Sequence, residues 1–133
     1  MIKLAMQTLS EHYGNHRGRG RRAARVLGHQ LGTDLAAGFV CSDLFTVIEE
    51  FAKFWKENGI GKVEWKKKDS MELAICTSQM SAGEEDRQML CPFEEGLLEA
   101  VLKKTLSEQV SVKETTCGGK LTGAECVFKI YLP

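Results

Sequence analysis

The last third of the chain holds three cysteines and one glutamate whose side chains could share a metal ion. They are Cys91, Glu114, Cys117 and Cys126. Three thiolates and one carboxylate are enough for tetrahedral zinc, and such a site would be structural because no coordination position stays open. The spacing alone is weak support, because a single cysteine is more often a buried apolar residue than a ligand.

The alternation of apolar residues brings two members of this set together. Residues 109–116 and 125–132 alternate as two strands joined by a turn, and Glu114 shares a face with Val112. Cys126 begins the apolar face of the second strand, so the hairpin would place it near Glu114. An inward carboxylate is costly unless it is paired or binds a metal, and nothing basic shares this face. A register shifted by one residue would instead leave Glu114 in solvent.

The other two thiols lie beside residues that shape the backbone. Cys117 precedes two glycines, which would let the chain fold sharply around an ion. Cys91 precedes Pro92, which suits the first turn of a helix. We therefore expect the helix to begin there and its dipole to favour a thiolate. Cys41 and Cys76 are expected to be core residues.

The elements that must position these residues alternate between helices and strand pairs. Apolar spacings of three and four predict helices over residues 23–38, 43–58 and 92–107. Alternation of apolar and polar residues predicts strands over residues 61–68, 71–77, 109–116 and 125–132. Gly28 and Gly32 weaken the first helix. Residues 13–22 are expected to be a loop or a frayed helix start, and residues 78–90 a loop. We predict an α+β fold of order helix-helix-strand-strand-helix-strand-strand, with an antiparallel four-stranded sheet and helices packed on one side.

Length and composition indicate one globular domain without a general affinity for charged partners. The 133 residues include 18 Lys plus Arg against 18 Asp plus Glu. No apolar run reaches the roughly 18–20 residues that span a bilayer. The N-terminus lacks the features of a secretory signal, so we expect a cytoplasmic location with reduced thiols. The odd number of cysteines, five, further disfavours a closed disulfide framework.

A basic segment suggests a second possible function. Residues 17–25 carry five arginines and no acid, from Arg17 to Arg25. They could hold a phosphate, nucleic acid or an acidic partner face. A solvated helix start, or pairing with the acidic residues 84–86, is the favoured alternative.

Three motifs stand in the last third of the chain: C-P-F-E-E-G at 91–96, V-K-E-T-T-C at 112–117 and G-A-E-C-V-F-K-I at 123–130. With them, the region from Cys91 to Tyr131 resembles the C-terminal half of the 4-vinyl reductase domain, a hydrocarbon-binding family. The order of elements from about residue 20 onward is compatible. The resemblance implies a single domain over 1–133, with an N-terminal helix and basic loop over 1–22 and a metal-binding half over 91–132.

The same resemblance implies relatives and a zinc site. The fold would be shared with sensor domains of aromatic-responsive transcription activators and with TRAPP vesicle-tethering subunits. In those sensor domains a zinc ion is held by a cysteine, an E-x2-C motif and a further cysteine. The matching residues here are Cys91, Glu114, Cys117 and Cys126.

The resemblance also implies a small apolar ligand between helices and sheet. The apolar candidates by phase, each of which could equally be ordinary core, are Phe39, Phe45, Ile48, Ile75 and Phe93. Ala74 and Cys76, small residues on the sheet opposite large ones, would either interdigitate into a tight core or leave room for a guest. Phenol-sensing members use a His and a Trp on the ligand hydroxyl, and neither stands at the matching distances from Cys91. His29 and Trp65 are the substitutes that the chain offers.

Binding is favoured over catalysis. The chain has no G-x-G-x-x-G after a strand, and its histidines, His12, His16 and His29, lie far from any obvious nucleophile. We expect a zinc-containing sensor domain for an apolar or aromatic molecule, with a homodimer implied by the family. The alternatives are a zinc-stabilised module for dimerisation or tethering, and a reductase acting on a vinyl or tetrapyrrole substrate.

Overall fold

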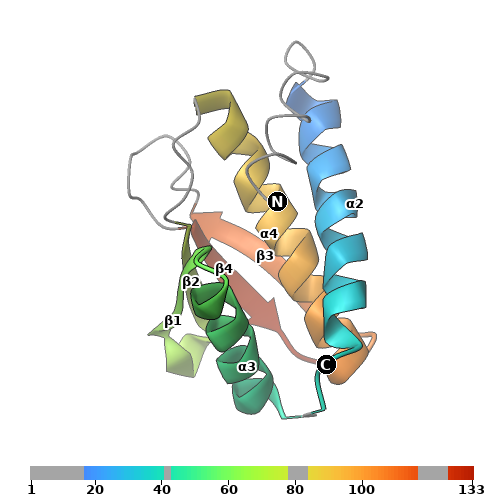
Figure 1. Cartoon of the computed structure of the whole chain (residues 1–133), viewed down its shortest axis with the longest axis vertical. Coiled ribbons are helices and arrows are strands. Elements are labelled where there is room, and N and C mark those ends of the chain that lie inside the picture. The colour runs from blue at the N-terminus through green and yellow to red at the C-terminus, as the bar shows by residue number, and fades with distance from the viewer. Residues whose placement is uncertain (1–16, 41–42, 78–83, 117–125) are drawn as a thin grey trace.

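The computed structural model describes residues 17–40, 43–77, 84–116 and 126–133 of the chain. In chain order the elements are α2 (Arg17–Ala36), α3 (Leu44–Glu57), β1 (Gly61–Lys67), a short 3-10 helix η1 (Lys68–Ser70), β2 (Glu72–Thr77), α4 (Glu84–Thr105), β3 (Ser111–Thr116) and β4 (Cys126–Tyr131) (Figure 1). This is the predicted α+β order, so the predicted fold class is confirmed.

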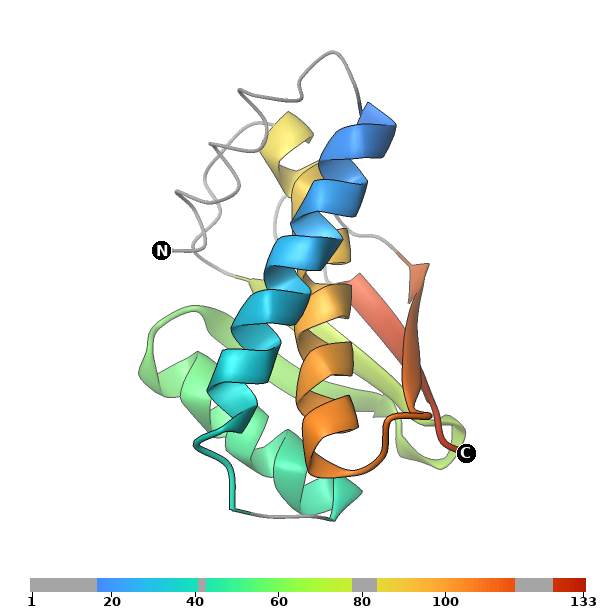
Figure 2. The ribbon, with the colours of Figure 1, turned by 90° about the vertical axis from the view of Figure 1, so that its right-hand side faces the viewer.

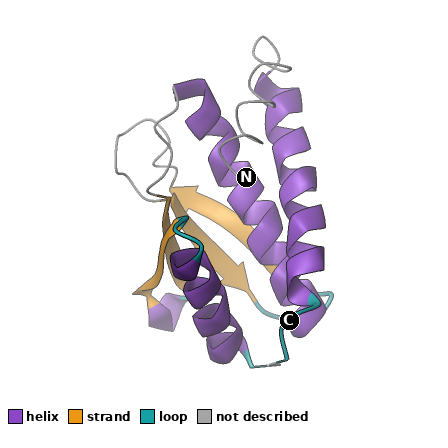
Figure 3. Ribbon diagram, in the orientation of Figure 1, coloured by secondary structure: helices purple, strands orange, loops and turns teal. Residues whose placement is uncertain are grey.

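The four strands form one antiparallel sheet in the order β1-β2-β4-β3. Both predicted strand pairs are present, β1 with β2 and β3 with β4. The central pairing of β2 with β4 joins them, and it places Leu73 opposite Phe128 and Ile75 opposite Cys126. The helices cover one side of this sheet, as predicted (Figures 2 and 3).

The core lies between that side of the sheet and the helices. Leu73, Ile75 and Phe128 are buried there, and α3 packs its Phe51 and Trp55 into the same core. Ala74 and Cys76 alternate with these residues, so they lie on the opposite side of the sheet. The expectation that they leave room for a guest beneath the helices is therefore wrong.

Helices α2 and α4 pack backbone to backbone. A Cβ atom on Gly28 would collide with the Phe93 carbonyl oxygen, and one on Gly96 would collide with the Arg25 carbonyl oxygen. Gly32 lies equally close to Leu97. The glycines that weaken α2 as an isolated helix are thus the residues that let α4 approach.

Two helix starts differ from the sequence expectations. α4 begins at Glu84, so part of the predicted loop is helical and Pro92 lies inside the helix. Pro92 lacks an N–H, but burial of the α4 segment around it offsets the lost hydrogen bond. Cys91 is therefore not at a helix start, and the argument from the helix dipole is wrong. α2 begins at Arg17, earlier than the predicted residue 23 and within the segment expected to be a loop or a frayed helix start. No described helix is both long and apolar enough to cross a membrane.

Candidate functional site

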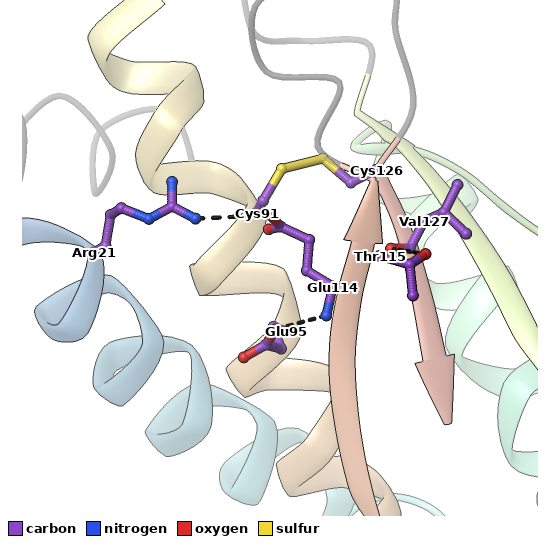
Figure 4. Close-up of a disulfide and its surroundings, with 7 residues drawn as sticks. All are labelled: Arg21, Cys91, Glu95, Glu114, Thr115, Cys126 and Val127. Carbon is purple, nitrogen blue, oxygen red and sulfur yellow. Dashed lines mark hydrogen bonds and ion pairs between the residues drawn. A yellow bond between two sulfur atoms is a disulfide. The ribbon is translucent and has the colours of Figure 1, made fainter. Parts of the chain in front are cut away.

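Two cysteines distant in sequence meet where α4 faces the start of β4. Cys91 and Cys126 lie 35 residues apart in sequence, both are buried, and their sulfurs are joined as a disulfide (Figure 4). This disulfide differs from the expectation, based partly on the odd number of cysteines, that the thiols are reduced. The pair is nevertheless two of the four residues predicted to meet, brought together from a helix and a strand.

Glu114 lies near this pair on the neighbouring strand. It is the register partner of Phe128, two residues along β4 from Cys126, and its side chain is only 19% exposed. Arg21 of α2 reaches its carboxylate, with 3.7 Å between Nη2 and Oε1. The expectation that nothing basic pairs with Glu114 is therefore wrong, because the cation comes from a helix and not from the sheet. Burial raises the pKa of Glu114; Arg21 opposes this rise and Glu95 adds to it.

Two carboxylates of α4 bind the backbone of β3. Glu95 Oε2 accepts from the Glu114 N–H at 2.8 Å, and Glu99 Oε1 accepts from the Val112 N–H at 3.0 Å. The acids are four residues apart on a helix, a rise of about 6 Å, which matches the roughly 6.6 Å between alternate strand residues. These two N–H groups of the edge strand are thus occupied by side chains of a helix.

Arg25 of α2 completes this cluster. Its Nε donates to Glu95 Oε1 at 2.7 Å and its Nη2 donates to Glu99 Oε2 at 2.6 Å. Burial alone would raise the pKa of Glu99, but the hydrogen bonds from Arg25 and Val112 lower it below the ordinary value. Burial likewise opposes the charge of Arg25, yet the two carboxylates raise its pKa. The Glu99 carboxylate is therefore held ionised.

The arginine segment is consequently only partly a surface feature. Arg21 and Arg25 are engaged with acids of β3 and α4, whereas Arg19 and Arg22 are exposed. The suggested pairing with residues 84–86 involves side chains outside the described part of the chain. Glu95 and Glu99 were not predicted from the sequence as members of a site. Their four-residue spacing on one helix was visible, but a partner 70 residues away leaves no local signal.

The predicted metal ligands are brought together in part. Cys91 and Cys126 meet, Glu114 lies on the inner face of the next strand, and Cys117 lies outside the described residues. Within the described ranges, no three His, Cys, Asp or Glu side chains group closely enough to hold a metal ion. Only the two sulfurs converge, and they are donors that zinc accepts once the disulfide is reduced to thiols.

The predicted pocket residues divide into two groups. Ile48, Ile75 and Phe93 are buried in the core, while Phe39 and Phe45 are half-buried. The ring of Phe45 lies 5.5 Å from that of Trp65, which is accordingly occupied by an aromatic contact. His29 is half-buried on α2. His12, His16 and Cys41 lie outside the described residues.

The core contains a buried polar atom, the indole Nε1 of Trp55, that was not predicted from the sequence to matter. Trp55 is 1% exposed and stacks on Phe51, with ring centroids 5.1 Å apart. Its indole Nε1 has no hydrogen-bond partner among the residues that the structure describes. Buried donors are usually satisfied, so this one requires an explanation.

The helices on one side of a β1-β2-β4-β3 sheet define an α+β domain of known type. A crystal structure of a vinyl-4-reductase family protein from Methanocaldococcus jannaschii shares the fold, with a TM-score of 0.52 and 17% identity. The match covers 81% of this chain and 66% of that one. The resemblance seen in the sequence is thereby confirmed at the level of the fold.

A sequence relative comes from the same organism. The uncharacterized protein MJ0150 of Methanocaldococcus jannaschii is 31% identical over 101 residues, which is 71% of this chain. The chain spans only 55% of that relative's length. No protein-family model matches the chain.

Proposed function

We propose that this chain is a ligand-binding domain of the 4-vinyl reductase type, stabilised by a zinc ion on Cys91, Glu114, Cys117 and Cys126. The observation that supports the proposed zinc site is the meeting of Cys91 and Cys126, which come from two elements that are far apart in sequence. Zinc binds thiolates, so the bound form requires this pair to be reduced. A reducing, cytoplasmic compartment is accordingly part of the proposal.

The ligand that we propose is a small apolar or aromatic molecule held in the core and not transformed. The buried Trp55 indole supports a guest that carries a hydrogen-bond acceptor, because an unsatisfied buried donor costs about 1–3 kcal/mol. The surrounding core is apolar, with Phe51 stacked on the indole and Ile48 and Ile75 buried in the same cluster. An aromatic molecule with one oxygen would match both features.

A thermal-shift screen tests this ligand class. Phenols, alkylbenzenes, fatty acids, isoprenoids and tetrapyrroles would be compared, and the protein as purified would be examined by mass spectrometry. A bound guest raises the melting temperature in a concentration-dependent way. The absence of any hit and any co-purified molecule would contradict the sensor function. A compound returned chemically altered after incubation with NADPH would instead support the reductase alternative.

A homodimer is the second part of the proposal, and α2 offers a surface for it. Val26 is 59% exposed, and Leu27, Leu31 and Leu35 are half-buried on the same helix. An interaction module for dimerisation or tethering would use such a surface without a ligand. Nucleic acid binding through Arg17–Arg25 is disfavoured, because two of its arginines are engaged with acids of the fold.

A further inference from the structure

We propose that the outer edge of β3 is a latent strand-pairing surface: acids of α4 keep it closed, and a second copy of β3 pairs there once those acids are removed. β3 stands at one end of the strand order β1-β2-β4-β3, so within the described sheet only one of its sides pairs with a strand. Backbone N–H groups on such an edge are a template for another chain. On β3 two of these groups, the N–H of Val112 and that of Glu114, donate instead to carboxylates of α4.

The two carboxylates take the place of a neighbouring strand because each divides its oxygens between α2 and β3. Glu95 accepts from Arg25 with Oε1 and from the Glu114 N–H with Oε2 (Figure 4). Glu99 accepts from Arg25 with Oε2 and from the Val112 N–H with Oε1. Arg25 thus holds both acids against the strand. Their side chains are only 14% and 8% exposed, so little water competes for these hydrogen bonds.

The opposite edge of the sheet, β1, is protected by other means. Lys62, Lys66 and Lys67 are exposed on this strand, and its pairing with β2 shifts register just before Lys67. Lysines and irregular pairing both oppose edge-to-edge association. β3 carries a single lysine, Lys113, and its register is irregular only beyond Glu114. The central N–H groups of β3 therefore depend on the acids of α4 for their protection.

The occupant is a second copy of β3, because the strand can pair with itself in the antiparallel sense without opposing like charges. A pair centred on Val112 places Val112 opposite its copy and Ser111 opposite Lys113. The N–H of Val112 points to the outer edge, as this register requires. A pair centred on Lys113 would instead oppose two lysines, and one centred on Glu114 would oppose two glutamates.

Removing the two acceptors from the full-length protein tests the inference. Multi-angle light scattering over a range of concentrations should show the double variant Glu95→Ala/Glu99→Ala reaching at least about twice the mass of the parent. The double variant Glu95→Gln/Glu99→Gln keeps an acceptor oxygen in each side chain, so it should behave as the parent. Val47→Ala removes core packing on α3 without touching the edge, and it should also keep the parent's mass.

Hydrogen exchange at the amides of Val112 and Glu114 identifies the surface. In the dilute double alanine variant both should exchange about 10-fold faster than in the parent, and they should regain protection at concentrations where the variant associates. An alanine variant that keeps the parent's mass, or that associates while both amides exchange fast, would overturn the proposal. Equal association of Val47→Ala would assign the effect to destabilisation and would also overturn it.

The single variant Glu95→Ala keeps the test decisive if the double variant does not fold, because Glu99 still binds Val112. It should release the Glu114 amide to exchange, leave the Val112 amide protected, and associate more weakly than the double variant. A Glu114 amide as protected as in the parent would show that Glu95 does not close the edge.

Discussion

Arg25 is the residue on which the carboxylates of α4 depend. It binds Glu95 and Glu99 at 2.7 and 2.6 Å, and those acids bind the backbone of β3 with their other oxygens. One side chain thus links two helices and an edge strand. Removing one partner of a buried ion pair is costly because the remaining charge stays desolvated.

Arg25→Met should therefore lower the free energy of unfolding by about 2 kcal/mol, less than for a fully buried pair because 32% of the Arg25 side chain is exposed. Urea denaturation followed by circular dichroism measures the change. Arg22→Met, on the exposed face of the same helix, should change the stability by no more than about 0.5 kcal/mol. Equal effects of the two substitutions would contradict the role of Arg25.

Glu99 should make stability depend on pH in the acid range. Its pKa is lowered in the folded state from the ordinary 4.5, so the folded protein binds fewer protons than the unfolded chain there. The stabilisation is fully present above this value and is lost as the pH falls through the lowered pKa. The stability difference between the parent and Glu99→Gln should consequently shrink as the pH falls from about 6 to about 3. Glu49→Gln, an exposed control on α3, should show a constant difference.

At the scale of elements, the contact between α2 and α4 depends on glycine. A methyl group at Gly28 would overlap the Phe93 carbonyl, whereas one at Gly38 would only touch the Leu35 carbonyl at 3.6 Å. Alanine normally favours a helix over glycine by about 1 kcal/mol, so steric overlap must outweigh this gain.

Gly28→Ala should lower the free energy of unfolding by about 2 kcal/mol, because the two helix backbones have to move apart. Gly38→Ala is the matched control and should be neutral. Chemical denaturation measures both variants. A Gly28→Ala protein as stable as the parent would mean that α2 and α4 are not in backbone contact.

The sequence predicted the elements better than their ends and their distant contacts. Alternation located β3 and β4, and apolar spacing located α3, whose N-cap Asp43 accepts a hydrogen bond from the Thr46 N–H. The start of α4 was wrong because Pro92 marks helix starts statistically, while tertiary burial decides here. The pairing of Arg25 with Glu95 spans 70 residues and has no local signature. The convergence of Cys91 with Cys126 was anticipated from the donor types and strand phase, and the family resemblance strengthened that prediction.

At the scale of the whole molecule, helices and sheet enclose one core that contains the Trp55 indole. If that indole binds the guest, Trp55→Phe should weaken phenol binding about 10-fold and leave toluene binding unchanged, because only phenol offers an oxygen acceptor. Trp65→Phe, the only other tryptophan, is the control and should affect neither. Isothermal titration calorimetry measures both ligands, and equal losses for phenol and toluene would indicate altered packing alone.

The proposed zinc ion would join α4 to the end of the sheet. Elemental analysis of protein purified under reducing conditions without a metal-binding tag should show about one zinc per chain, as four protein ligands require. Cys91→Ser and Cys126→Ser should lose the zinc, and Cys76→Ser, on the opposite side of the sheet, should retain it. Less than about a tenth of a zinc per chain in the reduced parent would contradict the central claim.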